Sequence, residues 1–228
     1  MRFTQTLTTL LLGATFTSLV AASPVNKTLV RRDQNLDDDI EADDETWARY
    51  TAWCGSTVSK RGLETRANKP SWIHNEVAMG NAAEMSGIPI GLWTQGLVTC
   101  LGVGAIGTKK EGGATYRALA HFTADKFSKE SQWTRFKSMV ENANLENVRT
   151  FLSVPDRENG VPDGWTDADK ELAEEIESEL KDRMDSLADG DAVKVVRQMK
   201  PAQERQGEAG SMGIDPSNVV YIEGNVVS

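Results

Sequence analysis

A cysteine and a histidine in the middle of the chain have the side chains with the most evident chemistry. Cys100 ends the stretch TQGLVTC, and His121 lies in ALAHFTA. A thiolate is a strong nucleophile, and a neighbouring imidazole lowers the pKa of the thiol and protonates a leaving group. Cys100 and His121 are therefore candidate catalytic residues. The other histidine, His74, is interpreted as a structural or surface residue.

The second cysteine, Cys54, leaves three interpretations of Cys100 open. A Cys54–Cys100 disulfide is the default expectation for an exported chain with two cysteines. A free catalytic thiol and a buried, inert thiol are the other two. The disulfide and the catalytic thiol can also be successive states of Cys100. Cys54 precedes the basic pair Lys60-Arg61, so a disulfide-linked pro-segment would mask Cys100 until the chain is cut and the disulfide is reduced. Because the spacing of Cys and His matches no zinc motif, we expect no metal and no cofactor.

Residues 1–22 have the features of a secretory signal peptide. Arg2 precedes a run of small, hydroxylated and apolar residues that extends to Val20, and two alanines follow. The run is too short and too polar for a membrane anchor. We therefore expect a secreted, extracellular protein with no membrane association after cleavage of the signal.

Residues 23–61 are predicted to be an acidic, disordered pro-segment. The stretch DQNLDDDIEADDE contains no aromatic residue and too little apolar surface to offset chain entropy. The basic pairs Arg31-Arg32 and Lys60-Arg61 are typical of sites cut by kexin-like proteases, and Asn26 begins a glycosylation sequon.

Residues 62–228 are long enough for a single domain with its own core. The formal net charge of the whole chain is −9. Such acidity argues against binding to nucleic acid or to an anionic membrane, because both need positive charge on the protein. The expected partner is a protein substrate or host target.

Two predicted strands position the candidate pair. The segments LVTCLGVGAIG and ATYRALAHFTA are joined by the turn sequence TKKEGG. A hairpin there places the strand of His121 beside the strand that follows Cys100. Facing side chains of antiparallel neighbours lie about 5 Å apart, which is within reach for a thiolate–imidazolium pair.

The remaining segments predict a mixed order of helices and strands. Apolar residues spaced by three and four predict helices over residues 166–190 and 131–144. Strands are predicted over 147–154, 191–199 and 219–227, a short helix over 74–85, and a surface loop over 201–218. The expected fold class is α/β in the α+β sense, a single domain with mixed β-sheet layers covered by helices.

The stretch GVGAIG, residues 102–107, spells the G-x-G-x-x-G pattern of dinucleotide-binding proteins. That pattern binds a pyrophosphate where a helix begins, since the amides of the first helical turn meet the phosphates. Here the turn sequence TKKEGG follows. We therefore interpret GVGAIG as part of a strand.

A resemblance to a known family connects Cys100 and His121 with Thr94. TQGLVTCLGV, residues 94–103, is similar to the T-x-G-L-x-S-C-x-A-V signature of the CheD-type glutamine deamidases. These enzymes share their catalytic fold with deamidating toxins such as cytotoxic necrotizing factor. The family follows its cysteine strand with a Gly-Gly turn and then the catalytic histidine, and Gly112-Gly113 and His121 occupy those places.

The resemblance implies a cysteine-dependent hydrolase that deamidates glutamine in a target protein, as a toxin or effector does. Cys100 would attack the carboxamide and His121 would protonate the departing ammonia. Thr94 would orient the imidazole or help to hold the oxyanion. Backbone amides around Thr99 and Cys100 would be the main oxyanion donors.

Two other functions remain open. One is a secreted, non-catalytic binding or virulence protein with the Cys54–Cys100 disulfide, in which tryptophans serve a binding surface. The tryptophans considered for that surface are Trp72, Trp93 and Trp133. The other is a cysteine peptidase or a transglutaminase-like transferase, although no papain-type sequence surrounds Cys100.

Overall fold

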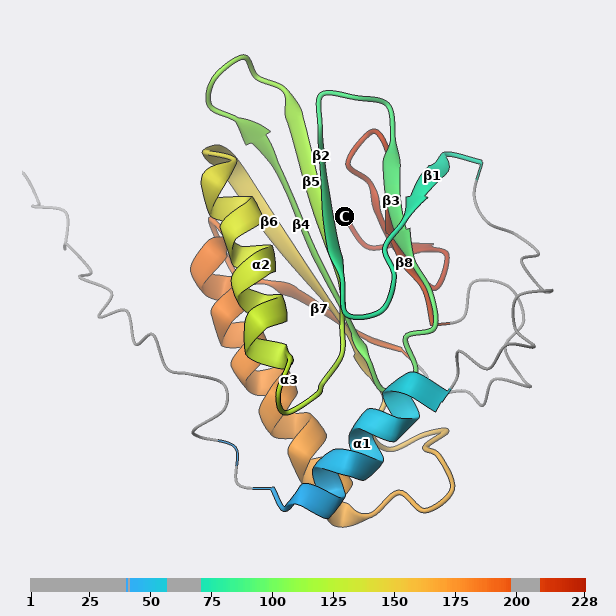
Figure 1. Ribbon diagram of the computed structural model, residues 1–228. Helices are drawn as coiled ribbons and strands as arrows, with labels where there is room; N and C mark the ends of the chain where they lie inside the picture. Colours follow the sequence, from blue (N-terminus) through green and yellow to red (C-terminus); the bar gives the residue numbers. More distant parts are fainter. Residues whose placement is uncertain (1–39, 41, 57–70, 198–209) are drawn as a thin grey trace, which may run out of the picture. The chain divides into compact units, whose positions relative to one another are not determined.

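The structure is a computed structural model that describes residue 40 and residues 42–56, 71–197 and 210–228 (Figure 1). For residues 55, 56, 73 and 74 it describes the backbone alone. Residues 34–228 form one compact unit, to which all described residues belong. The predicted signal peptide, Asn26 and both basic pairs lie outside the described residues.

The described residues form three helices and two five-stranded sheets. The helices are α1 (Asp44–Ser56), α2 (Lys129–Asn142) and α3 (Asp167–Leu187). The strands are β1 (Ile73–Glu76), β2 (Ala82–Ser86), β3 (Gly91–Thr94), β4 (Leu101–Lys109), β5 (Thr115–Phe122), β6 (Leu145–Pro155), β7 (Val193–Arg197), β8 (Met212–Ile214), β9 (Val220–Ile222) and β10 (Asn225–Val226).

Both sheets are mixed. The first sheet has the order β1-β3-β8-β9-β10, and β1 is parallel to β3 while the other neighbours are antiparallel. The second has the order β2-β5-β4-β6-β7, and β6 and β7 are its parallel pair. The predicted α+β class, one domain with mixed sheets and helices, is confirmed.

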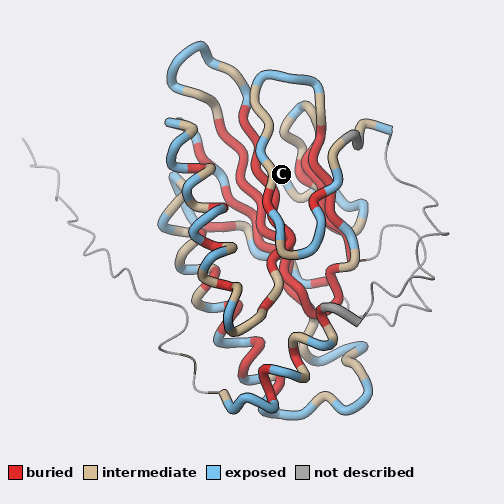
Figure 2. The backbone as a smooth tube through the Cα atoms, viewed as in Figure 1, coloured by how far each residue is buried: buried red, intermediate tan, exposed pale blue. Residues whose placement is uncertain are grey.

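The second sheet lies between α2 and α3 on one face and the first sheet on the other (Figure 1). In β4, Val103 belongs to the apolar cluster under the helices, whereas a side chain at Gly102 or Gly104 would meet Met212 of β8 within 3 Å. Successive residues of a strand face opposite sides, so this alternation explains why β4 is buried on both faces (Figure 2). Gly102 and Gly104 thus let the two sheets approach each other.

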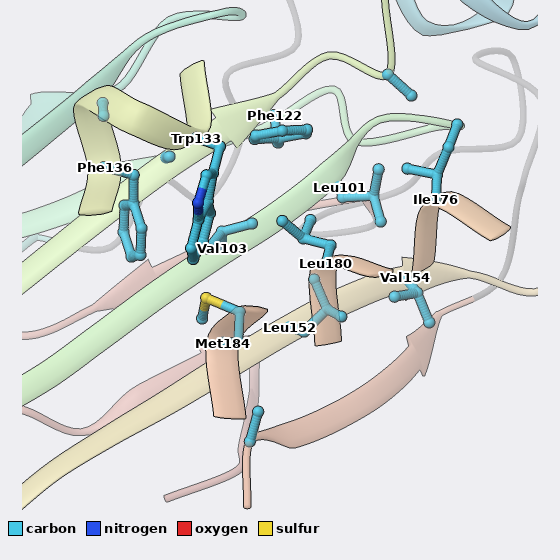
Figure 3. Close-up of a cluster of buried hydrophobic side chains, with 14 of the residues drawn as sticks. Leu101, Val103, Phe122, Trp133, Phe136, Leu152, Val154, Ile176, Leu180 and Met184 are labelled. Carbon is cyan, nitrogen blue, oxygen red and sulfur yellow. The ribbon is translucent and has the colours of Figure 1, made fainter. Parts of the chain in front are cut away.

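The layer between the second sheet and the helices is an apolar core (Figure 3). Side chains from β4, β5 and β6 meet those of α2 and α3 there. We call this layer the helix-side core; it includes Leu101, Val103, Phe122, Trp133, Phe136, Leu152, Val154, Ile176, Leu180 and Met184.

The predicted hairpin and the two predicted long helices are confirmed. β4 and β5 pair continuously, from Leu101 with Phe122 to Thr108 with Thr115. α3 begins with a capping box, in which the Thr166 hydroxyl accepts the backbone N–H of Asp169 and the Asp169 carboxylate accepts the backbone N–H of Thr166. Two N–H groups that the first helical turn leaves unpaired are satisfied in this way.

The short helix predicted over residues 74–85 is wrong. β1 and β2 occupy its two ends, and between them Gly80 has a φ of 73°, which breaks a helix. β1 pairs with β3, and β2 pairs with β5. Pairing with two different sheets therefore overrides the local helical pattern.

The C-terminal segment contains more and shorter strands than predicted. The strand expected over residues 219–227 is the hairpin of β9 and β10, because Glu223 and Gly224 both have positive φ values, of 50° and 78°. Within the expected surface loop, β8 is fully buried between β3 and β9. The remainder of that loop up to residue 209 lies outside the described residues.

The prediction of a disordered segment is wrong for α1. The side chains of Trp47, Tyr50 and Cys54 are buried and recur at spacings of three and four, as on one face of a helix. Asp43 accepts the backbone N–H of Thr46 at 2.7 Å, and acidic residues fill the first turn. Asp43, Asp44 and Glu45, the last acids of the stretch interpreted as disordered, thus lie at the start of a helix, whose N-terminal end favours negative charge.

None of the helices in the described part of the chain combines the length and the apolar character that a membrane crossing requires.

Candidate functional site

Thr94, Cys100 and His121 meet between the two sheets. His121 pairs with Gly102 in the β4–β5 ladder, and directly opposed residues share a face, so the imidazole points towards the first sheet. Cys100 immediately precedes β4 and belongs to the cluster between the sheets. Thr94 is the last residue of β3 and approaches the imidazole from the opposite sheet.

A chain of hydrogen bonds fixes the tautomer of His121. The Thr94 hydroxyl donates to the carbonyl of Val77 at 2.9 Å, and its oxygen lies 2.8 Å from Nδ1 of His121. Because a hydroxyl has one proton, which Val77 receives, the imidazole must donate from Nδ1. The lone pair of the ring is therefore on Nε2.

His121 is neutral in this environment. Its side chain is buried, and burial lowers its pKa to about 3; the positive charge of Arg197 acts in the same direction. Nε2 is buried and has no hydrogen-bond partner among the described residues. Most buried polar atoms have a partner, and Nε2 shares the lack of one with several other buried side-chain atoms, among them Trp47 Nε1 and Ser153 Oγ.

Cys100 forms a disulfide with Cys54 of α1, with a Cα–Cα distance of 5.0 Å. The disulfide was one of the three interpretations of Cys100. The two sulfurs and a ring nitrogen of His121 lie within 4.8 Å of one another. The sequence therefore predicted the proximity of sulfur and imidazole correctly, while the structure holds the sulfur in its oxidised state.

The loop that ends at Cys100 is fixed by buried donors. The guanidinium of Arg197 donates to the carbonyls of Val98, at 2.7 Å, and of Cys100. The Tyr50 hydroxyl donates to the carbonyl of Thr99 at 3.2 Å. Three successive peptide groups are thus held in place, and with them the position of the sulfur.

Arg197 is a residue of this site that the sequence analysis missed. It ends β7 and is 1% exposed, and its positive charge contributes to the low pKa of His121. In the sequence, Arg197 is a charged residue at the end of a strand that has valines on one face. This pattern is too common to indicate a site.

The site is closed to solvent. The exposed fractions of Thr94, Cys100, His121, Cys54 and Arg197 are all between 0% and 1%, too low for a substrate to touch any of them. We refer to these five residues as the between-sheet site.

α1 forms part of the cover of the between-sheet site. Its Arg49 pairs with the buried Asp169 of α3 at 3.3 Å. The rings of Tyr50 and Trp53 pack against Trp165, with ring centroids 5.9 and 5.2 Å apart. The helix is therefore anchored along its length, and the disulfide ties its last turn to Cys100.

Other sequence candidates do not join the site. Trp93 and Trp133 are each 4% exposed and lie in different layers, so the alternative in which they serve a binding surface is wrong for these two. Trp72 packs against Trp93 and Tyr221. For His74 the structure describes the backbone alone.

Comparison with known proteins gives no assignment: no family model matches the sequence, and a search of curated proteins finds no significant match. The similarity to the CheD-type signature therefore remains a resemblance of one motif.

Proposed function

We propose that the reduced form of this protein is a secreted, cysteine-dependent amidohydrolase that deamidates glutamine side chains of a target protein. One observation carries the proposal. The three residues that match the deamidase motif come from β3, the β3–β4 loop and β5, and they meet with Nδ1 of His121 fixed by Thr94. The lone pair of Nε2 is left without a hydrogen-bond partner among the described residues, and a ring nitrogen of His121 lies within 4.8 Å of the Cys100 sulfur.

The reaction requires the Cys54–Cys100 bond to open first. An external dithiol, such as a thioredoxin-type protein, supplies two electrons and two protons and becomes a disulfide, while Cys54 and Cys100 become thiols. The last turn of α1 must also move away from Cys100, since the sulfur is fully buried in the oxidised protein. Oxidation thus keeps the proposed enzyme inactive.

The chemical steps then follow from the positions of the side chains. The Cys100 sulfur attacks the carboxamide carbon while its proton passes to Nε2 of His121. His121 returns this proton to the nitrogen as the C–N bond breaks, so ammonia leaves and a thioester remains. Water, deprotonated by the same imidazole, attacks the thioester and yields glutamate and the free thiol.

Thr94 keeps the imidazole in the tautomer that these steps need. A neutral ring with its proton on Nδ1 accepts a proton at Nε2, and this is the state found in the structure. Thr94 acts through His121, so it is a positioning residue.

The anchored loop offers donors for the oxyanion. Peptide groups are planar and trans, so the N–H of Thr99 points away from the Val98 carbonyl and the N–H of Cys100 away from the Thr99 carbonyl. Arg197 and Tyr50 hold those two carbonyls. Both N–H groups are thereby directed away from Arg197 and Tyr50 and fixed before a substrate binds, which is what an oxyanion hole requires.

The test compares two variants that break the same disulfide. We expect ammonia release and conversion of glutamine to glutamate, measured on a glutamine-rich protein, from the wild type only after reduction. Cys54→Ser should be active without a reductant, because Cys100 is then free. Cys100→Ser should be inactive with or without it, and so should His121→Ala. Equal activities of Cys54→Ser and Cys100→Ser would refute the proposal.

A second candidate, a secreted non-catalytic binding protein, is favoured by the disulfide and by the complete burial of the between-sheet site. In that case the disulfide is structural. Fast alkylation of Cys100 by iodoacetamide at mildly acidic pH, after gentle reduction, is expected of the enzyme. Slow alkylation throughout would favour the binding protein.

A further inference from the structure

The between-sheet site contains a second sulfur that the deamidation steps do not use. Amide hydrolysis needs Cys100 and His121 and leaves Cys54 without a role beyond the disulfide. Yet both sulfurs and the imidazole converge, with all three ligand atoms within 4.8 Å and all three side chains buried. We propose that reduction converts this cluster into a binding site for Zn²⁺, with Cys54 Sγ, Cys100 Sγ and His121 Nε2 as ligands.

The distances fit this ion. Zinc binds thiolate sulfur at about 2.3 Å and imidazole nitrogen at about 2.0–2.1 Å, so ligand atoms around one tetrahedral zinc lie roughly 3.5–4 Å apart. When the S–S bond opens, the sulfurs separate from bonding distance. The Cα–Cα distance of 5.0 Å lets rotation of the two cysteine side chains produce that separation.

The surroundings of His121 are those of a metal ligand. A ligating imidazole donates its other ring N–H to a fixed acceptor, which sets the tautomer and the direction of the lone pair. Here Nδ1 donates to Thr94, and Thr94 is itself held by the carbonyl of Val77. The other nitrogen, Nε2, is buried and has no hydrogen-bond partner among the described residues.

The charges also balance. Two thiolates neutralise the two positive charges of Zn²⁺, so no net charge is added to a buried position, where an unpaired ion is costly.

The reaction is a reduction followed by proton release. An external dithiol supplies two electrons and two protons to the disulfide and itself becomes a disulfide. A phosphine supplies the two electrons and becomes a phosphine oxide, while water supplies the oxygen and the two protons. Zn²⁺ then displaces the two thiol protons. Three protein ligands result, the number found in zinc sites with an open fourth position. The inference goes beyond the proposed function and does not need it, since zinc binding requires Cys54 and deamidation does not.

The experiment uses the secreted protein and Co²⁺ as a spectroscopic probe for Zn²⁺. After reduction with a phosphine in the absence of air, one equivalent of Co²⁺ should give thiolate-to-cobalt charge-transfer absorption and visible bands of a tetrahedral complex. Addition of Zn²⁺ should abolish both the charge-transfer absorption and the visible bands. The unreduced protein should give neither, and the bands should be lost in Cys54→Ser and in Cys100→Ser.

Thr94 provides a matched pair of variants for the role of the imidazole. Thr94→Val removes the acceptor for Nδ1 and should weaken Zn²⁺ binding by about 10-fold or more, whereas Thr94→Ser keeps the hydroxyl and should bind as the wild type does. Equal affinities of the two variants would show that His121 is not a ligand held in this way.

If reduction destabilises the fold, a second measurement still tests the proposal. Zn²⁺ binds the folded state, so it should raise the Tm of the reduced wild type and leave that of reduced Cys54→Ser unchanged. A reduced wild type that neither shows the cobalt bands nor gains stability with Zn²⁺ would overturn the inference. Absorption is measured without a substrate, so this outcome is independent of whether the protein releases ammonia.

Discussion

The two faces of the second sheet are packed on different principles. The helix-side core consists of apolar side chains from three strands and two helices. The opposite face holds the between-sheet site, where a threonine, a histidine and an arginine are buried beside the disulfide. Apolar contacts tolerate substitution when the volume is kept, whereas buried polar groups depend on particular partners. The first face therefore depends mainly on shape and volume, whereas the second combines an apolar cluster with polar groups that need particular partners.

The largest effect is expected from a cavity in the helix-side core. Phe136 is fully buried, so Phe136→Ala should lower the free energy of unfolding by about 3–5 kcal/mol, measured by denaturant titration. Phe127 is 88% exposed, and Phe127→Ala should change the free energy of unfolding by less than about 0.5 kcal/mol. Similar losses in the two variants would contradict the assignment of the core.

On the opposite face, a fall in pH should lower the free energy of unfolding, and the group responsible is His121. Its pKa is about 3 in the folded protein and 6.5 in an unfolded chain, so the unfolded state binds more protons between these values. Stability is therefore unaffected above pH 6.5 and is lost as the pH falls towards 3, by up to about 1.4 kcal/mol per pH unit.

Carboxylates titrate in the same range, so the difference between the wild type and His121→Gln isolates the histidine. In the oxidised, metal-free protein this difference in unfolding free energy should shrink steadily below pH 6.5. Parallel pH profiles of the two proteins would show that His121 is not buried as a neutral ring.

An intermediate effect is expected at Arg197. Arg197→Lys keeps the charge but cannot reach both the Val98 and the Cys100 carbonyls with a planar fork of donors. Leaving a buried carbonyl without a donor should lower the free energy of unfolding by about 1–3 kcal/mol. A loss below about 0.5 kcal/mol would mean that the loop does not depend on this residue.

The smallest effect concerns the start of α3 on the helix side. Thr166→Ala removes the hydroxyl that accepts the Asp169 N–H and should lower the unfolding free energy by about 1 kcal/mol. Thr134 is an exposed residue within α2, and Thr134→Ala should be neutral or slightly stabilising, because alanine favours helices. The opposite order of the two variants would argue against the capping box.

Local patterns predicted the helix-side elements well. α2, α3, β4, β5 and β6 each have a periodicity of apolar residues long enough to select helix or strand. Shorter segments were harder to predict. β8 has three residues in a polar context, and β1 and β2 flank a turn, so their structure depends on pairing with distant strands.

Of the between-sheet site, the motif indicated Thr94, Cys100 and His121, and the structure brings them together. Arg197 was missed because it contacts the loop of residues 98–100 from nearly a hundred positions along the chain, through main-chain carbonyls that carry no sequence signal. The helix that carries Cys54 was interpreted as disordered, since its acidic first turn masked a short apolar face.

The sequence by itself determined which residues have reactive side chains, which segments are long helices and strands, and that β4 and β5 form a hairpin, because these features depend on neighbours along the chain. Tertiary structure alone decided that Thr94 fixes the tautomer of His121, that Cys54 reaches Cys100, and that Arg197 anchors the loop beside them. Hydrogen bonds and a disulfide between residues far apart in the chain form only where packing of the two sheets brings their atoms to within a few ångströms.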